Sequence, residues 1–149
     1  MSKRILVSSL IGVAVIGGIT AGGIAMASAA TEPALKNGSA HYVAPSGGSA
    51  GSLTFTADVS DDSGIRGLKV VAWPASSKLD PTAAELRHVD SAKCESTTAE
   101  TSRCTYTLKV TKEEAADLAQ GTWYVSALAT AKDGDTKFVP RAATFGVTS

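Results

Sequence analysis

The sequence predicts an all-β protein folded as an antiparallel sandwich of about seven strands, with a short helix before the penultimate strand. Segments in which apolar and polar residues alternate recur at fairly regular spacing, and clusters of Asp, Ser, Gly and Pro separate them. Helical signals are confined to two short stretches. The chain also begins like an exported protein, a setting in which small sandwich domains are common.

The first 30 residues are interpreted as a signal peptide for secretion. Lys3 and Arg4 precede an uncharged apolar run over residues 5–27, and small residues occupy positions 27–29, as in a cleavable signal. The run is also long enough to cross a bilayer, so an uncleaved anchor is the alternative, which its Gly and Ser content disfavours. We therefore expect a secreted protein, extracellular or associated with the cell envelope, with no membrane contact after cleavage.

The mature chain has the length of one domain and a nearly balanced charge. The 149 residues less these 30 leave 119, enough for a single core. The 14 basic residues less Lys3 and Arg4 leave 12 against 14 acidic ones, a net charge of about −2. Because such a domain has no basic surface to neutralise phosphates, nucleic acid is excluded as a partner.

The mature chain divides into a lead and a sandwich. Residues 31–51 are expected to form a flexible lead with the first strand, and residues 52–149 the immunoglobulin-like sandwich. The first strand is placed at 39–43, in the segment SAHYV. The Gly- and Ser-rich segment APSGGSAGS follows it and predicts a flexible linker.

The second and third strands are joined by a turn. The second strand, over 53–60, directs alternate residues to one buried face: Leu53, Phe55, Ala57 and Val59. The segment DDSG at 61–64 predicts a turn, because Asp and Ser side chains bond nearby backbone groups and Gly tolerates positive φ. The third strand, over 68–74, ends at Pro74.

The middle of the chain predicts a helical turn and two facing strands. The turn covers 80–86, with Asp80 as N-cap and Pro81 at the first helical position. Strands at 87–95 and 103–111 then face each other across a polar connection.

Cys94 and Cys104 are the two cysteines of the chain and lie in these facing strands. In an oxidising compartment a disulfide between them is expected, closing the strand connection. A reactive or metal-binding pair is the alternative, but neither a neighbouring His nor a third Cys supports it.

A short helix precedes the last two strands. Thr111 and Glu114 form a capping box that predicts a helix of about two turns. Strands follow at 121–133 and 136–147, and Pro140 interrupts the second of them, which suits an edge or a bulge. Seven strands of this kind favour an immunoglobulin or fibronectin type III sandwich, with a jelly roll or small barrel as the alternative.

Two resemblances agree with this fold. The segments ADVSDDSGIRGLKV and GTWYVSALATAKDGDT resemble strand-turn-strand passages of bacterial immunoglobulin-like domains. The mature chain, particularly VVAWP, CTYTLKV and TWYVSALATAKDGDTKFVPRAATF, also resembles small secreted proteins of high-GC Gram-positive bacteria that are known as a domain of unknown function. The resemblance implies a fold and an exported location, and it implies neither an activity nor site residues.

Four acidic residues form one candidate site. In a seven-stranded sandwich the loops after the second strand and before the last strand lie at the same pole. Asp61 and Asp62 would then approach Asp133 and Asp135, and four carboxylates could supply the oxygen ligands of Ca²⁺. Asp-Ser-Gly and Asp-Gly are also ordinary turn residues, so solvated turns are the competing interpretation. The acids lie on short turns that give no sign of the cleft a glycosidase pair requires.

A catalytic function is not expected. The two histidines, His41 and His88, lie in different predicted strands, and no hydrolase, metalloprotease or phosphate-loop motif occurs. No cofactor is therefore predicted, apart from the calcium hypothesis.

An apolar strip on the outer face of one sheet is the other candidate site. If the third and penultimate strands are neighbours, alternation brings together Val71, Trp73, Tyr124 and Leu128. Left exposed, this strip has the character of a protein- or glycan-binding face. The alternative is that the loop over 74–86, or the short helix near 115–118, covers it as a satellite core.

We therefore expect a secreted, non-catalytic binding module whose partner is an extracellular protein or an envelope glycan. A structural or protective envelope protein without a specific ligand is the second hypothesis, and an uncharacterised enzyme is the third.

Overall fold

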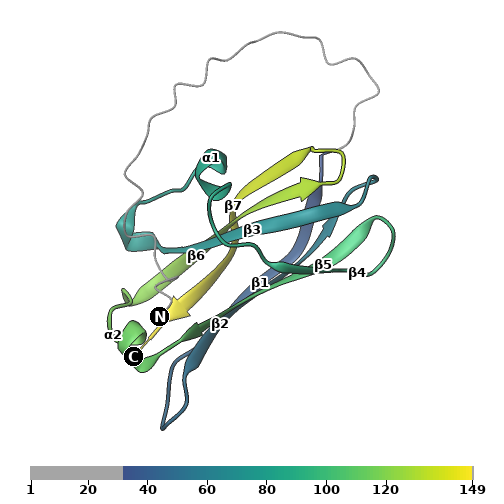
Figure 1. Ribbon diagram of the computed structural model, residues 1–149. Helices are drawn as coiled ribbons and strands as arrows, with labels where there is room; N and C mark the ends of the chain where they lie inside the picture. Colours follow the sequence, from purple (N-terminus) through teal and green to yellow (C-terminus); the bar gives the residue numbers. More distant parts are fainter. Residues whose placement is uncertain (1–31, 149) are drawn as a thin grey trace.

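The computed structural model describes residues 32–148, so the expected signal peptide lies outside the described residues. The chain forms two antiparallel sheets packed face to face (Figure 1). The strands are β1 (Ala34–Val43), β2 (Gly51–Ser60), β3 (Ile65–Pro74), β4 (Lys93–Ser96), β5 (Thr101–Val110), β6 (Gly121–Ala131) and β7 (Thr136–Val147). The helices are η1 (Ala75–Ser77), α1 (Ala83–Leu86) and α2 (Lys112–Ala116).

The order of the strands is that of a constant-type immunoglobulin sandwich. One sheet runs β1-β2-β5-β4 and the other runs β3-β6-β7. The predicted all-β sandwich, with a short helix before the penultimate strand, is confirmed. Among the described residues, no helix combines the length and apolar character needed to cross a membrane.

The main core lies between the sheets, and the alternation of the strands produces it. On β2 the four apolar residues predicted to face inward are all at most 5 % exposed. They pack against the inward faces of β3, β5 and β6, which face them across the sandwich or lie beside them. The main core consists of Phe55, Ala57, Val59, Leu68, Val70, Cys104, Tyr106, Val125, Ala127 and Ala129.

β1 is longer than predicted and belongs to the sandwich. It begins at Ala34 and pairs with β2 along its length, with an irregularity between Lys36 and Ser39. Asn37 lies there with φ 56°, and the Asn-Gly pair is accommodated as a bulge. The expected flexible linker is a hairpin connection, in which Ser46 and Ser49 exchange backbone hydrogen bonds of 2.9 and 3.1 Å.

The two α-helices differ in detail from the prediction. The N-cap of α1 is Thr82, whose hydroxyl accepts a hydrogen bond from the Glu85 N–H. Asp80 has φ 43° and cannot take the extended N-cap conformation. In α2 the predicted capping box is present between Thr111 and Glu114, but the helix has only five residues instead of two full turns.

The segment before β4 passes from one sheet to the other. The Val70 N–H donates to the Asp90 carbonyl at 3.0 Å, and the Ala92 N–H donates to the Leu68 carbonyl at 2.7 Å. From Lys93 onward the chain pairs with β5 instead. β4 is therefore confined to residues 93–96, whereas the sequence predicts a strand over 87–95.

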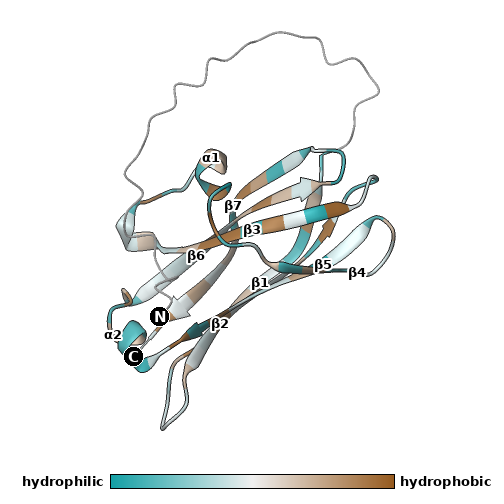
Figure 2. Cartoon of the chain, in the orientation of Figure 1, coloured by the Kyte–Doolittle hydropathy of each residue, from teal (hydrophilic) through white to brown (hydrophobic). Residues whose placement is uncertain are grey.

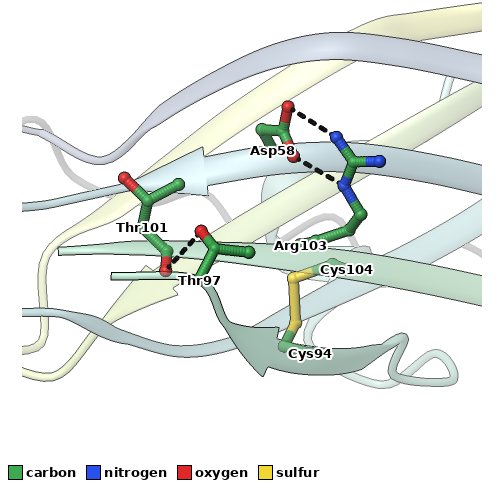
Figure 3. The surroundings of a disulfide bond; sticks show 6 residues. All are labelled: Asp58, Cys94, Thr97, Thr101, Arg103 and Cys104. Carbon is green, nitrogen blue, oxygen red and sulfur yellow. Dashed lines mark hydrogen bonds and ion pairs between the residues drawn. A yellow bond between two sulfur atoms is a disulfide. The ribbon is translucent and has the colours of Figure 1, made fainter. Parts of the chain in front are cut away.

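The predicted disulfide joins β4 to β5. Cys94 and Cys104 lie directly opposite each other, with Sγ atoms 2.03 Å apart and Cα atoms 4.0 Å apart. Near the bond, the Arg103 Nε lies 3.0 Å from Asp58 Oδ1 across β5 and β2 (Figure 3). Hydrogen bonds from Asn37 and Arg103 lower the pKa of Asp58. The disulfide and this ion pair together link three adjacent strands.

Replacing both cysteines by alanine should lower the free energy of unfolding by about 2 to 3 kcal/mol, because the bond closes a short loop in the unfolded chain. The two residues are separated by 10 positions in the sequence. Urea unfolding of the Cys94→Ala/Cys104→Ala variant measures the loss, and the wild-type protein under reducing conditions provides the control. Equal unfolding midpoints for the oxidised and reduced protein would contradict the expectation.

Candidate functional site

The predicted apolar strip is assembled but is not exposed. Trp73 lies opposite Tyr124 in the pairing of β3 with β6, with ring centroids 5.0 Å apart. Trp73 is only 2 % exposed, and Val71 and Leu128 are buried beside it. The strip therefore cannot serve as an exposed binding face in this conformation, and that hypothesis is corrected.

The cover of the strip is α1 and the loops on either side of it. In Figure 1 this segment lies over β3 and β6. Leu86 of α1 is fully buried on the strip, and Figure 2 shows apolar residues both along β3 and in the α1 segment. The covering side chains are Leu79, Ala83, Leu86 and Val89, and Phe138 of β7 packs beside the strip. The structure therefore agrees with the alternative prediction, in which the loop over 74–86 covers the strip as a satellite core.

A chain of hydrogen bonds satisfies the buried polar atoms of the strip. The Trp73 Nε1–H donates to Ser126 Oγ at 2.9 Å, and Ser126 Oγ donates to the Pro140 carbonyl at 2.7 Å. Pro140, Arg141 and Ala142 stand opposite Ser126, where the register of β6 and β7 shifts between Val125 and Ala127. Pro140 therefore lies at a bulge, as the sequence predicts. Ser126 on β6, which sequence reasoning overlooked, thus links Trp73 of β3 to Pro140 of β7.

Three of the four predicted acidic ligands come together. One carboxylate oxygen from each of Asp61, Asp62 and Asp133 lies within 4.8 Å of the others. The loops that carry them are bonded to each other, because the Asp133 backbone N–H donates to the hydroxyl oxygen of Ser63 at 3.2 Å. Asp135 is not a member of this group, and its N–H donates to Asp133 Oδ1 at 3.0 Å.

The electrostatics of these loops are dominated by negative charge. Asp61 Oδ2 accepts hydrogen bonds from the hydroxyl and the N–H of Ser63, at 2.6 and 2.9 Å, and these bonds lower the pKa of Asp61. Partial burial, followed by the nearby charges of Asp133, Asp61 and Asp62, raises the pKa of Asp135. The charges of the acidic group thus affect the pKa of Asp135, although Asp135 does not belong to the group.

A third candidate site, an open sheet edge, was not found from the sequence. β4 begins at Lys93, so its pairing with β5 extends no further than Thr105, whereas β5 continues to Val110. In an antiparallel sheet the backbone groups of successive residues point alternately to the two neighbouring strands. The hydrogen bonds at the start of β5 therefore show which of its residues direct their backbone groups away from β2, toward the side that β4 leaves open.

Two backbone hydrogen bonds establish that direction. The Asp61 N–H donates to the Glu100 carbonyl at 2.9 Å, toward β2, and the Thr97 N–H donates to the Thr101 carbonyl at 2.9 Å, toward β4. Odd-numbered residues of β5 consequently direct their backbone groups toward β4. Thr107 and Lys109 belong to this set, and within the described part of the chain neither has a strand partner on that side.

A groove of about 520 Å³ runs beside the open edge. One wall is β5, and the other is the segment that crosses between the sheets. Its lining residues are Asp90, Ser91, Lys93, Thr105, Tyr106, Thr107 and Leu108. The groove was not predicted, because the alternation over 87–95 does not reveal where the chain changes sheets.

Replacing Trp73 by alanine should lower the free energy of unfolding by about 3 to 5 kcal/mol, because a large buried side chain is removed. Trp73→Phe should cost less, roughly 1 to 2 kcal/mol, since it retains most of the packing and loses the bond to Ser126. Denaturant unfolding measures both. The control is Val43→Ala, at a side chain 46 % exposed, with an expected change within about 0.5 kcal/mol. An unchanged midpoint for Trp73→Ala would show that the strip is not a core.

Comparison with known proteins gives a family and no activity. Neither a curated protein nor a solved structure matches the chain. The profile of one protein family matches residues 35–129, more than half of the sequence, and spans the strands from β1 to most of β6. It includes Cys94, Cys104 and the open part of β5. The chain therefore belongs to DUF5707, a family of unknown function.

Proposed function

We propose that the protein is a secreted, non-catalytic binding module of the cell envelope or extracellular space, and that it binds an extended segment of an extracellular protein along the open edge of β5. The observation that carries this proposal is the pair of unmatched backbone positions at Thr107 and Lys109 beside the groove. An added strand would satisfy them, as in recognition by strand addition.

The chemistry of the edge supports a polypeptide partner. Each of Thr107 and Lys109 offers one N–H and one C=O, so a strand alongside can form up to four backbone hydrogen bonds. Side chains of the added strand would point alternately toward and away from the groove. Lys93 and Lys109 are exposed near the two ends of the open edge, which favours a segment that carries acidic residues.

Two features support the secreted location. The disulfide suits an oxidising compartment, and residues 1–30 have the composition of a signal peptide. The resemblance to small secreted proteins of high-GC Gram-positive bacteria agrees with both. A non-catalytic role is supported by the groove itself, whose lining includes no His, Cys or paired carboxylates.

The second candidate is a protective envelope protein without a specific ligand. Exposed Lys93 and Lys109 favour it, because lysines on an edge strand also protect it from unwanted pairing. The two functions differ in whether the edge accepts a strand, which can be tested directly.

The test is selection of binders from a library of displayed random peptides, followed by measurement on two variants. Thr107→Pro removes the outward N–H without removing a bond to β2, so it should change stability by no more than about 1 kcal/mol. It should abolish binding of the selected peptides. Thr107→Ala loses the same side chain but keeps the N–H, and it should bind like the wild type.

Lys109→Pro is a second variant of the same kind and should also lose binding. A thermal melt establishes that each variant is folded. Selection of no peptide, or equal binding by Thr107→Pro and Thr107→Ala, would reject the open edge as the binding site and favour the protective role.

A further inference from the structure

The loops between β2 and β3 and between β6 and β7 form an acidic group that belongs to neither the groove nor the covered strip. Its members are Asp61, Asp62 and Asp133, each with one carboxylate oxygen within 4.8 Å of the others. Asp61 is buried, with 5 % of its surface exposed, whereas Asp62 and Asp133 are exposed. A buried carboxylate next to two others is electrostatically unfavourable unless positive charge compensates it.

Asp61 Oδ1 supplies an independent observation. This oxygen is buried and accepts no hydrogen bond from any of the described residues. The two donors of Ser63 both bond to the other oxygen, Oδ2. The Asp62 carboxyl also lies against Asp61, and an ionised carboxylate cannot donate. A buried oxygen of this kind calls for a partner.

The basic side chains do not provide that partner. Among the described residues, the ion pairs join Arg103 to Asp58 and Lys137 to Glu32. Arg66, which is close in space, directs its Nη2 to the Lys132 carbonyl at 3.1 Å. In the part of the chain that the structure describes, no Lys or Arg side chain therefore forms an ion pair with any of the three aspartates.

We propose that Asp61, Asp62 and Asp133 bind a hard divalent cation, best matched by Ca²⁺, with Asp61 Oδ1 as the inner ligand. All donors are oxygens, without the His or Cys that transition metals prefer. Exposure of Asp62 and Asp133 leaves room for the waters that complete a shell of six to eight ligands. Mg²⁺ fits less well, because it requires a stricter octahedral arrangement and releases its waters reluctantly.

The bound ion would connect the two sheets. Asp61 follows β2 of the four-stranded sheet, and Asp133 lies between β6 and β7 of the three-stranded sheet. Backbone contacts already hold the loops together, since the Lys132 N–H donates to the Gly64 carbonyl at 3.0 Å. The ligands are thus positioned before binding, and the ion stabilises the folded chain in proportion to its occupancy.

The test is a calcium titration of the purified protein by calorimetry and thermal melting. Saturation at millimolar Ca²⁺ should raise Tm by several degrees, with a smaller rise in Mg²⁺. Asp133→Asn should lose most of the calcium-dependent rise. Asp117→Asn removes one exposed charge at the end of α2, remote in sequence from both loops, and should keep it.

Asp61→Asn gives a second readout that does not depend on the metal. Its amide can donate from the position of Oδ1 while its carbonyl still accepts from Ser63. In chelator the variant should therefore melt no lower than the wild type, and calcium should leave its Tm unchanged. A wild-type Tm that does not respond to Ca²⁺, an equal response to NaCl at matched ionic strength, or an unaltered response in Asp133→Asn would overturn the proposal.

Discussion

The pairing of β2 with β5 is the constraint on which the rest of the structure depends. Its register runs without a shift from Gly51 opposite Val110 to Ser60 opposite Thr101. A slip by one residue would turn the whole apolar face of β2 to solvent. The same register places Cys104 for its bond to β4, brings Asp61 to Glu100, and directs the backbone of Thr107 outward. Core, disulfide, acidic loop and open edge are therefore consequences of one pairing.

The features predicted correctly from the sequence are those that short-range periodicity determines. Alternation separates Leu68 and Val70, which enter the main core, from Val71 and Trp73, which enter the covered strip. The capping box of α2 likewise depends on residues three positions apart. Features that depend on distant parts of the chain were predicted only as one of two alternatives, as with the cover of Trp73 by the loop over 74–86, or were missed, as with the short β4. The burial of Trp73 requires Leu86 to fold back onto the sheet, and no local pattern announces that contact.

The cover over the strip also changes the role assigned to its aromatic residues, from binding to packing. An indole is often an energetic centre of a binding surface, but here its N–H is satisfied internally by Ser126 and its ring is packed under α1. Trp73 therefore stabilises the folded chain and does not form part of a binding surface. Because the outer face of the three-stranded sheet is occupied in this region, the proposed binding surface lies at an edge of the other sheet. The crossing of the segment 90–92 to β3 creates that edge, since it shortens β4.

The open edge and the acidic loops can act independently, because β5 separates them along its length. Asp61 bonds to Glu100, immediately before β5 begins, whereas Thr107 lies six residues beyond Thr101. At about 3.4 Å per residue this is a separation of roughly 20 Å. It exceeds the Debye length of about 8 Å at physiological ionic strength, so charge on the loops has little direct influence at the groove. A cation would instead act through the stability of the sandwich, by holding the end of β2 against the β6–β7 loop. The bound cation would then stabilise the β2–β5 pairing at the end opposite Thr107, and this pairing orients the Thr107 backbone.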